Sequence, residues 1–270
     1  MLSPLYGQLS PLRVPTRVAP AGDPDVLAYI AAVEAADGQS LEEGVATAFT
    51  DFIVGCKTDG IWSAIKASCI LAGAKTLAGA LVPLVGSSPT NNNFVSGDYN
   101  RKTGLKGNGS TKYLNANRSA NDDSQNNTHI SAYQKEAFSG VRSLIGLAQN
   151  SPYHATLILT NGAVYYPRVQ SSTGSMTNQG GGNTVGLFGA SRSSGSSYQA
   201  KSGTGSVNTI NVTSSATIGY NYYVFATNSA GTLASPFGGR LSFYSIGEHL
   251  DLTALNSRVS TLMTDLAAAI

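Results

Sequence analysis

Charge is scarce in this sequence. Lys, Arg, Asp and Glu make up 12% of its 270 residues, and the formal net charge is only +2. An average globular domain carries about twice that share of charged residues. Nucleic-acid binding needs clustered Lys and Arg against the phosphates, so the composition argues against nucleic acid as the main partner. Ser, Thr, Asn, Gln and Gly replace the missing charges, and such a surface suits proteins outside cells or in rigid assemblies.

Cysteine is nearly absent. Cys56 and Cys69 are the only two, and two cysteines alone make no metal site. Both fall in helical patterns, which favours small buried side chains over a disulfide between them. The first residues lack a basic start followed by an apolar core, so we expect no secretory signal.

No run of the sequence suits a membrane span. The most apolar stretch is CILAGAKTLAGALVPLVG, residues 69–86, and Lys75, Pro83 and several glycines interrupt it. It also ends short of a comfortable bilayer length. We therefore expect a buried helix end followed by a buried strand, with no membrane insertion.

Proline, by contrast, is concentrated in residues 1–22, which hold four of the ten prolines. The phrase Leu-Ser-Pro-Leu occurs at residues 2–5 and again at 9–12. Each proline forces extended geometry on the residue before it and removes an amide donor, so this segment cannot be a helix. We predict an extended, apolar docking arm, whose contacting residues are Leu2, Pro4, Leu5, Tyr6, Leu9, Pro11, Leu12 and Val14.

Three helices are expected next, forming a helical subdomain over residues 23–75. The first begins with Asp23 as N-cap and ends at Gly38. Residues 40–43 read as a capping box for the second helix. A third is predicted to restart at residues 59–60 and run through Cys69. The apolar face of the second helix is Leu41, Val45, Phe49, Phe52, Ile53 and Cys56.

Residues 76–250 have the pattern of short strands separated by turns. Two strand-like runs flank Asn161-Gly162, a strong hairpin signal. Residues 206–214 alternate apolar and polar side chains, and residues 220–237 read as a strand, a small loop and another strand. Residues 171–184 have the composition of a flexible loop. We predict a mainly β fold, an antiparallel jelly-roll sandwich.

The last predicted element is a helix over residues 251–270. Its apolar stripe either covers its own domain or pairs with copies of itself in an oligomer. The stripe residues proposed for such an oligomer are Leu252, Leu255, Val259, Leu262 and Leu266.

Catalytic chemistry finds little support in the sequence. Glycoside hydrolysis on a jelly roll requires two facing carboxylates, and the β region offers no strand motif that pairs them. Asp122 and Asp123 are consecutive in a loop, so a solvated or calcium-holding loop over residues 121–127 is the better interpretation. The three histidines are far apart and near no nucleophile. We expect no catalytic residue, no metal and no cofactor.

Tyrosine is the one residue type with binding potential. Several tyrosines lie on predicted strands, where alternation must expose some of them. An exposed tyrosine beside Asn and Ser offers an aromatic face with a polar edge at low entropic cost. The candidate glycan contacts are Tyr165, Tyr166 and Tyr222, while packing in the sandwich core and at its rim is the role favoured for most of the strand tyrosines.

Three stretches also resemble a module of tailed-bacteriophage virion proteins that often occurs near the ends of tail fibres. They are DGIWSAIKASCILAGAKTLAGALVPLVG (59–86), NFVSGDYNRKTGLKGNGSTKYLNANR (93–118) and GGRLSFYSIGEHLDLTALNSRV (238–259). The module is similar to concanavalin A-like (laminin G-like) sandwiches. The resemblance covers residues 40–270, more loosely over 120–235.

The resemblance implies a non-enzymatic virion structural protein and carries over no catalytic or ligand residue. It suggests a peripheral tail appendage, anchored on other virion proteins by the arm, forming a homo-oligomer (a trimer is favoured) and able to bind a host cell-surface glycan. A short arm in place of a long fibre leaves a capsid decoration protein as the alternative. A polysaccharide-cleaving enzyme is the third.

Overall fold

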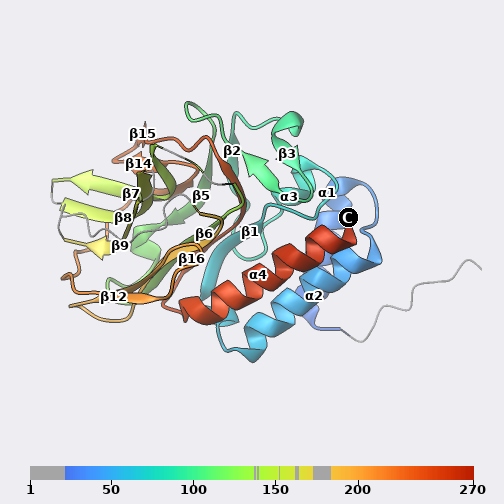
Figure 1. Cartoon of the computed structure of the whole chain (residues 1–270), viewed down its shortest axis with the longest axis horizontal. Helices are drawn as coiled ribbons and strands as arrows, with labels where there is room; N and C mark the ends of the chain where they lie inside the picture. Colours follow the sequence, from blue (N-terminus) through green and yellow to red (C-terminus); the bar gives the residue numbers. More distant parts are fainter. Residues whose placement is uncertain (1–21, 137, 139, 152, 162–163, 173–183) are drawn as a thin grey trace, which may run out of the picture.

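The protein is a layered sandwich in the computed structural model, which describes residues 22–136, 138, 140–151, 153–161, 164–172 and 184–270. Two β-sheets face each other, and a layer of helices lies against the outer face of one of them (Figure 1). The predicted fold class is confirmed, since the chain is mainly β with a terminal helix. The predicted arm residues lie outside the described residues.

Sheet A, with eight strands, is the central layer. Seven strands follow the order β12-β11-β10-β6-β16-β4-β3, and β1 also pairs with β16. Their bounds are β12 Asn208–Ile210, β11 Tyr198–Lys201, β10 Gly186–Arg192, β6 Thr128–Gln134, β16 Arg240–Gly247, β4 Gly104–Lys106, β3 Tyr99–Asn100 and β1 Ile65–Ile70.

Sheet B, also with eight strands, is the outer layer. Six strands follow the order β15-β14-β7-β13-β5-β2, while β8 pairs with β7 and β9 pairs with β8. Their bounds are β15 Thr232–Ala234, β14 Thr227–Ser229, β7 Val141–Asn150, β13 Asn221–Val224, β5 Tyr113–Ser119, β2 Thr90–Asn92, β8 Tyr153–Asn161 and β9 Val164–Ser171. The predicted hairpin is confirmed as β8 and β9, which pair from Asn161 and Val164 outward.

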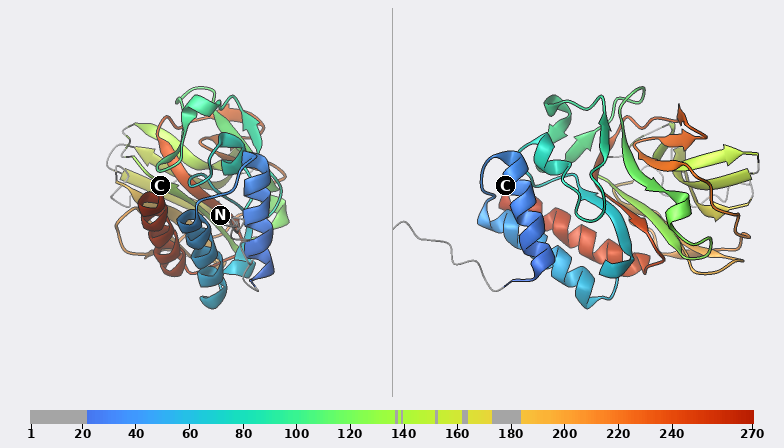
Figure 2. Two further views of the ribbon diagram at one scale, coloured as in Figure 1. Left: turned by 90° about the vertical axis from the view of Figure 1, so that its right-hand side faces the viewer. Right: turned by 180° about the vertical axis from the view of Figure 1, so that it is seen from behind.

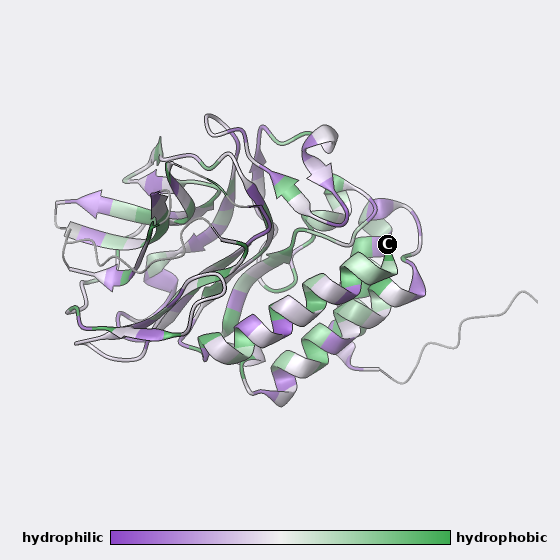
Figure 3. Ribbon diagram, viewed as in Figure 1, coloured by the Kyte–Doolittle hydropathy of each residue, from purple (hydrophilic) through white to green (hydrophobic). Residues whose placement is uncertain are grey.

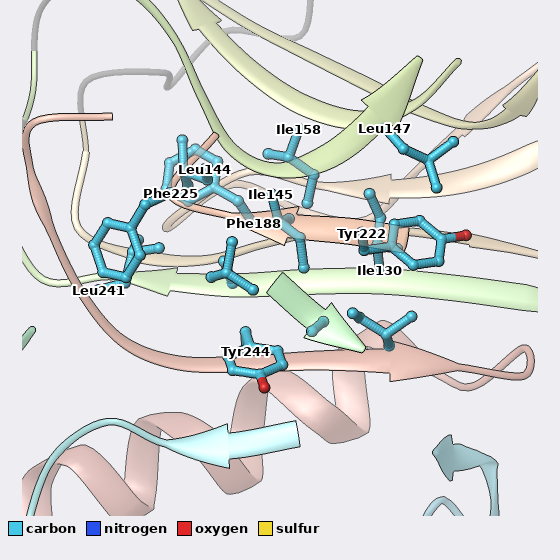
Figure 4. Packing of buried hydrophobic residues seen from close by; sticks show 14 of the residues in the cluster. Ile130, Leu144, Ile145, Leu147, Ile158, Phe188, Tyr222, Phe225, Leu241 and Tyr244 are labelled. Atoms are coloured by element: carbon cyan, nitrogen blue, oxygen red, sulfur yellow. The ribbon is translucent and has the colours of Figure 1, made fainter. Parts of the chain in front are cut away.

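One hydrophobic core fills the space between the sheets. Side chains from both sheets meet there, including Ile130 of β6, Ile145 of β7 and Tyr222 of β13 (Figure 4). A second core lies between the helices and the outer face of sheet A, where Leu187 and Phe243 project toward them. Sheet A is therefore buried on both faces, and every residue of β6 and β10 is buried.

The helices form one row on sheet A, with α2 between α1 and α4 (Figure 2). Their bounds are α1 Pro24–Asp37, α2 Glu43–Thr58, the short α3 Leu77–Ala80 and α4 Leu252–Ala269, with 3-10 turns at Trp62–Ala64, Ser96–Asp98 and Ala120–Asp122. Apolar and hydrophilic bands alternate along α2 and α4, as in amphipathic helices (Figure 3). No helix in the described ranges has the length and apolar character needed to cross a membrane.

The first predicted helix is confirmed at both ends. Asp23 caps α1 through its side chain, and Gly38 ends it in the left-handed conformation. The apolar face predicted for α2 is also buried. The capping box was wrong, because α2 begins at Glu43 with no side-chain cap. Glu42 instead binds Arg101 and Lys75.

The third predicted helix was wrong. After a single 3-10 turn at Trp62–Ala64 the chain continues as strand β1, and Cys69 lies on that strand. β1 pairs with β16 in the middle of sheet A and is covered on both sides, so its apolar residues do not alternate. An unbroken apolar run of this kind fits a helical spacing equally well.

The stripe of α4 covers its own domain. Leu252, Leu255, Val259, Leu262 and Leu266 are each at most 1% exposed and belong to the second core. The prediction that these residues form an oligomer contact was therefore wrong, because α2 and sheet A already occupy that face.

Candidate functional site

The outer face of sheet B is the broad sheet face that no described helix covers. The second core, where helices meet a sheet, draws its strand residues from sheet A. Sheet B turns its other face to the sandwich core, so its outward side chains alternate with core residues. Leu114, Tyr222 and Val224 belong to that core, and Tyr113, Asn115 and Tyr223 alternate with them and are half-buried. Tyr113 also packs against residues of the sandwich core.

Strand register aligns five outward residues in a row across sheet B. Thr90 of β2 lies opposite Asn115 of β5, and Asn115 lies opposite Tyr223 of β13. Tyr223 lies opposite Gly146 of β7, which in turn lies opposite Leu157 of β8. The row therefore runs from polar side chains through an aromatic ring to an aliphatic side chain.

Two tyrosines stack at the centre of this face. The rings of Tyr113 and Tyr223 have centroids 4.4 Å apart and planes inclined by 36°. Burial, reinforced by the neighbouring Tyr113 hydroxyl, raises the pKa of the Tyr223 phenol above its ordinary value. The phenol therefore stays neutral near pH 7, and the pair presents ring surface with an uncharged hydroxyl edge.

Side-chain amides beside the tyrosines are held in place by local hydrogen bonds. The amide of Asn117 donates to the Ser88 carbonyl at 2.8 Å, and that of Asn92 donates to the Thr90 carbonyl at 3.2 Å. The Asn115 side-chain oxygen accepts from the Asn117 backbone N–H at 3.0 Å. Asn115 is thus oriented by its oxygen, while its amide N–H groups remain available to a ligand.

The other half of the face is apolar. Ala155, Leu157 and Leu159 of β8 form a small cluster with Ala148 and Tyr166 packed against it. Gly146 joins this cluster to the tyrosine pair, and it leaves no space for a larger residue. A Cβ at position 146 would lie 2.3 Å from the Leu157 Cβ atom. The three β8 side chains are at most 8% exposed, so this half of the face is packed within the protein and the half with the two tyrosines is the part open to a ligand.

Of the three predicted glycan contacts, two were wrong. Tyr165 and Tyr222 are fully buried in the sandwich core, and the Tyr165 hydroxyl donates to the Gly189 carbonyl. Tyr166 is half-buried on the outer face, as its position next to Tyr165 requires. Sequence reasoning missed Tyr113 and chose the wrong member of the Tyr222–Tyr223 pair, because the two alternatives differ only by a register shift of one residue.

Carboxylates of the β region are engaged in structural contacts. Asp123 pairs with Arg118, and Asp122 accepts the Ser119 backbone N–H. Glu136 pairs with Arg240, and Glu248 pairs with Lys66. Within the described residues, no group of three or more His, Cys, Asp or Glu side chains could hold a metal ion.

The histidines and cysteines are structural as well. His129 and His154 are buried and hydrogen-bonded to backbone carbonyls, and His249 contacts the Ser191 hydroxyl. Cys56 and Cys69 are both buried and unpaired, so the preference for buried side chains over a disulfide is confirmed. Burial raises the pKa of each thiol to about 12.

No family model matches the sequence, and no curated protein matches it. Solved structures with partial similarity include the CBM40 module of a Ruminococcus gnavus IT-sialidase bound to α2,3-sialyllactose, at 14% identity and TM-score 0.38, over 50% of this chain and 82% of that one. The botulinum neurotoxin serotype D binding domain is similar at 9% identity and TM-score 0.48, over 73% and 51%. A leech intramolecular trans-sialidase is similar at 10% identity and TM-score 0.38, over 66% and 27%.

Proposed function

We propose that the protein is a non-enzymatic structural protein of a bacteriophage virion, a tail appendage that binds a neutral host cell-surface glycan through the outer face of sheet B. The observation that carries the binding part is the Tyr113–Tyr223 pair, flanked by oriented amides on an uncovered sheet face. The virion part rests on the sequence resemblance of residues 59–86, 93–118 and 238–259.

The chemistry of the face suits an uncharged sugar. An apolar ring surface can stack against the C–H groups of a pyranose, while phenol and amide groups bond to its hydroxyls. Lys112 lies next to Tyr113 in the chain, but Asp98 neutralises it by an ion pair. The lysine beside this tyrosine is therefore not free to attract an acidic sugar.

The layer order is consistent with glycan binding and anchoring on opposite sides of the molecule. The outer face of sheet B and the helix layer lie on opposite sides of sheet A (Figure 1). Residues 1–21 join the helix layer at Asp23, which caps α1. A protein docked through these residues would therefore present sheet B away from the particle.

Removing both rings is expected to weaken glycan binding. We expect the Tyr113→Ala/Tyr223→Ala double variant to lose about 5- to 150-fold in affinity for neutral bacterial polysaccharides on a glycan array, because two rings that each supply stacking worth about 0.5–1.5 kcal/mol contribute about 1–3 kcal/mol together. The double Tyr→Phe variant keeps the rings and is expected to retain most of the binding.

A control is Val95→Ala, which truncates a side chain that is 60% exposed and lies in none of the strands of sheet B. It should bind like the unmodified protein. Equal binding by the double alanine variant, with an unchanged melting temperature, would remove the tyrosine pair from the proposal.

Immunogold electron microscopy of particles from the phage that encodes the chain would test the virion role independently of glycan binding. We expect gold at the tail. Gold across the head would favour a capsid decoration protein instead, and unlabelled particles would reject a virion role altogether.

A further inference from the structure

The core between the two sheets is polar at one of its ends. Six polar side chains from five strands lie there, and each is at most 1% exposed. They are Thr128 of β6, His154 and Thr156 of β8, Gln170 of β9, Arg192 of β10 and Tyr222 of β13. Thr128 begins β6 and lies opposite Arg192, which ends β10. A buried polar group costs free energy unless it finds a hydrogen-bond partner, so each of these groups needs one.

Three of the six residues have side-chain polar atoms without such a partner in the described part of the chain. These atoms are the hydroxyl groups of Thr128 and Tyr222 and both polar atoms of the Gln170 amide. Arg192 does not supply the missing bonds, because its guanidinium donates to four backbone carbonyls. Ordered water commonly completes buried groups of this kind and typically makes about three hydrogen bonds to them.

The unpartnered groups lie near one another. Burial raises the pKa of the Tyr222 phenol, and the hydroxyls of Thr128 and Thr156 are close enough to oppose that rise. Neither hydroxyl makes a direct hydrogen bond with the phenol. The backbone N–H of Gln170 donates to the Thr156 hydroxyl at 2.8 Å, so the Gln170 side chain starts from the same place. Close polar groups that do not bond directly are the ones that a water molecule bridges.

The Thr156 hydroxyl has one acceptor position left for such a water. The Nδ1 atom of His154 faces the Ala216 carbonyl at 2.8 Å, and a carbonyl only accepts, so Nδ1 carries the ring proton. Burial lowers the pKa of His154 and keeps the ring neutral near pH 7, which makes Nε2 an acceptor. The Thr156 hydroxyl therefore donates to Nε2, 3.1 Å away, and one of its two lone pairs accepts the Gln170 N–H. The second lone pair remains.

We propose that ordered water binds at this end of the sandwich core, bridging Tyr222 and Thr128 to Thr156 and Gln170. One molecule balances the donors and acceptors, because it accepts from the Tyr222 and Thr128 hydroxyls and donates to the Thr156 lone pair and the Gln170 side-chain oxygen. A second molecule is needed for the Gln170 side-chain N–H groups. Thr128 belongs to sheet A and the other three residues to sheet B, so the water joins the two sheets. The inference holds whether or not the outer face of sheet B binds a glycan.

The field dependence of the water ¹⁷O relaxation rate tests the proposal directly, since it counts the water molecules that stay inside a protein longer than the protein takes to rotate. We expect the Tyr222→Phe/Thr128→Val variant, which keeps the shapes of both side chains, to hold at least one long-lived water fewer than the unmodified protein. Tyr165→Phe is the matched control. Its hydroxyl is equally buried but donates directly to the Gly189 carbonyl at 2.7 Å, so the count should not change. Equal counts for the double variant and the unmodified protein would overturn the proposal.

The sign of a stability change gives a second test. If the Tyr222 hydroxyl is bonded to water, Tyr222→Phe is expected to lower the urea midpoint by about 0.3 M, the shift that one lost hydrogen bond produces. A hydroxyl without any partner would cost free energy in the folded state, and its removal would raise the midpoint instead. A raised midpoint would overturn the proposal. A lowered midpoint with an unchanged water count would also overturn it, in favour of a direct bond between Tyr222 and one of the two threonines.

Discussion

Replacing Arg192 with Met is expected to cost about 3–5 kcal/mol of the free energy of unfolding, the cost typical of removing one partner from a buried charged network. Arg192 ends β10 and is fully buried. Its guanidinium donates to four backbone carbonyls, those of Val169, Ser194, Ser197 and Val212, at 2.8–3.1 Å. Methionine would fill the space and leave all four without this donor.

The charge of Arg192 persists although it is buried. Desolvation lowers the pKa of the guanidinium to about 10, so it remains protonated near pH 7. Its carbon Cζ also lies 5.0 Å from the centre of the Tyr198 ring, which favours the cation. One side chain thus joins β9, the turn after β10 and the chain beyond β12.

Urea denaturation followed by circular dichroism would measure the loss. The matched control is Arg258→Met, which breaks a partly exposed pair with Asp59 and should cost at most about 1 kcal/mol. Arg192→Lys is expected to fall between the two, because an ammonium cannot reach four carbonyls in a plane. Similar losses of unfolding free energy for Arg192→Met and Arg258→Met would contradict this prediction. They would mean that water hydrogen-bonds to the four carbonyls in place of the guanidinium.

Acidification from pH 7 to pH 4 is expected to destabilise the protein by about 3 kcal/mol through His129 alone, since each unit of pKa shift is worth about 1.4 kcal/mol. The His129 ring is buried between the Glu248 carbonyl, 2.5 Å away, and the Ser245 hydroxyl, 2.7 Å away. Burial is the main cause that lowers the pKa of this imidazole to about 4.

The direction of the pH effect on stability follows from the numbers of protons that the folded and unfolded chains bind. Between pH 6.5 and pH 4 the unfolded chain protonates this histidine and the folded chain does not, so stability falls as the pH falls and levels off below the folded pKa. Burial lowers the pKa of His154 as well, which adds to the same trend. Arg101 lowers the pKa of Glu42 to about 2, so that carboxylate loses its contribution only at lower pH.

Urea midpoints measured from pH 7.5 to pH 4 would follow this loss. The His129→Asn variant is expected to be less stable at pH 7.5 but to lose clearly less stability on acidification. A flat profile for the unmodified protein over this range would contradict a neutral buried His129.

Local signals predicted both ends of α1, whereas the packing of the layers determined the structure of Ile65–Ile70. Asp23 and Gly38 act within a few residues of themselves, so the sequence shows where α1 begins and ends. Ile65–Ile70 became a strand because β16 pairs with it and helices cover its outer face. The local sequence shows neither the pairing with β16 nor the helices that cover this strand. Its apolar pattern was therefore also compatible with a helix.

The candidate site depended on strand register in the same way. The adjacent pairs Tyr165–Tyr166 and Tyr222–Tyr223 show that one tyrosine of each must face outward, yet nothing local selects which. The position of Tyr113 beside Tyr223 depends on the pairing of β5 with β13, more than a hundred residues apart. The sequence predicts that tyrosines contribute to the outer face of sheet B, but it does not predict which tyrosines these are.

The pairing of β1 with β16 also sets the order in which a nascent chain can mature. Ser68 lies opposite Ser245, and β16 separates β1 from β6 in the middle of sheet A. The central sheet therefore cannot close until β16, which follows β1 by about 170 residues, has left the ribosome. Contacts of such sequence separation form slowly, and the exposed edges of β1 and β6 are prone to aggregate while they wait. We expect synthesis of this protein to place a demand on chaperones that its modest size does not suggest.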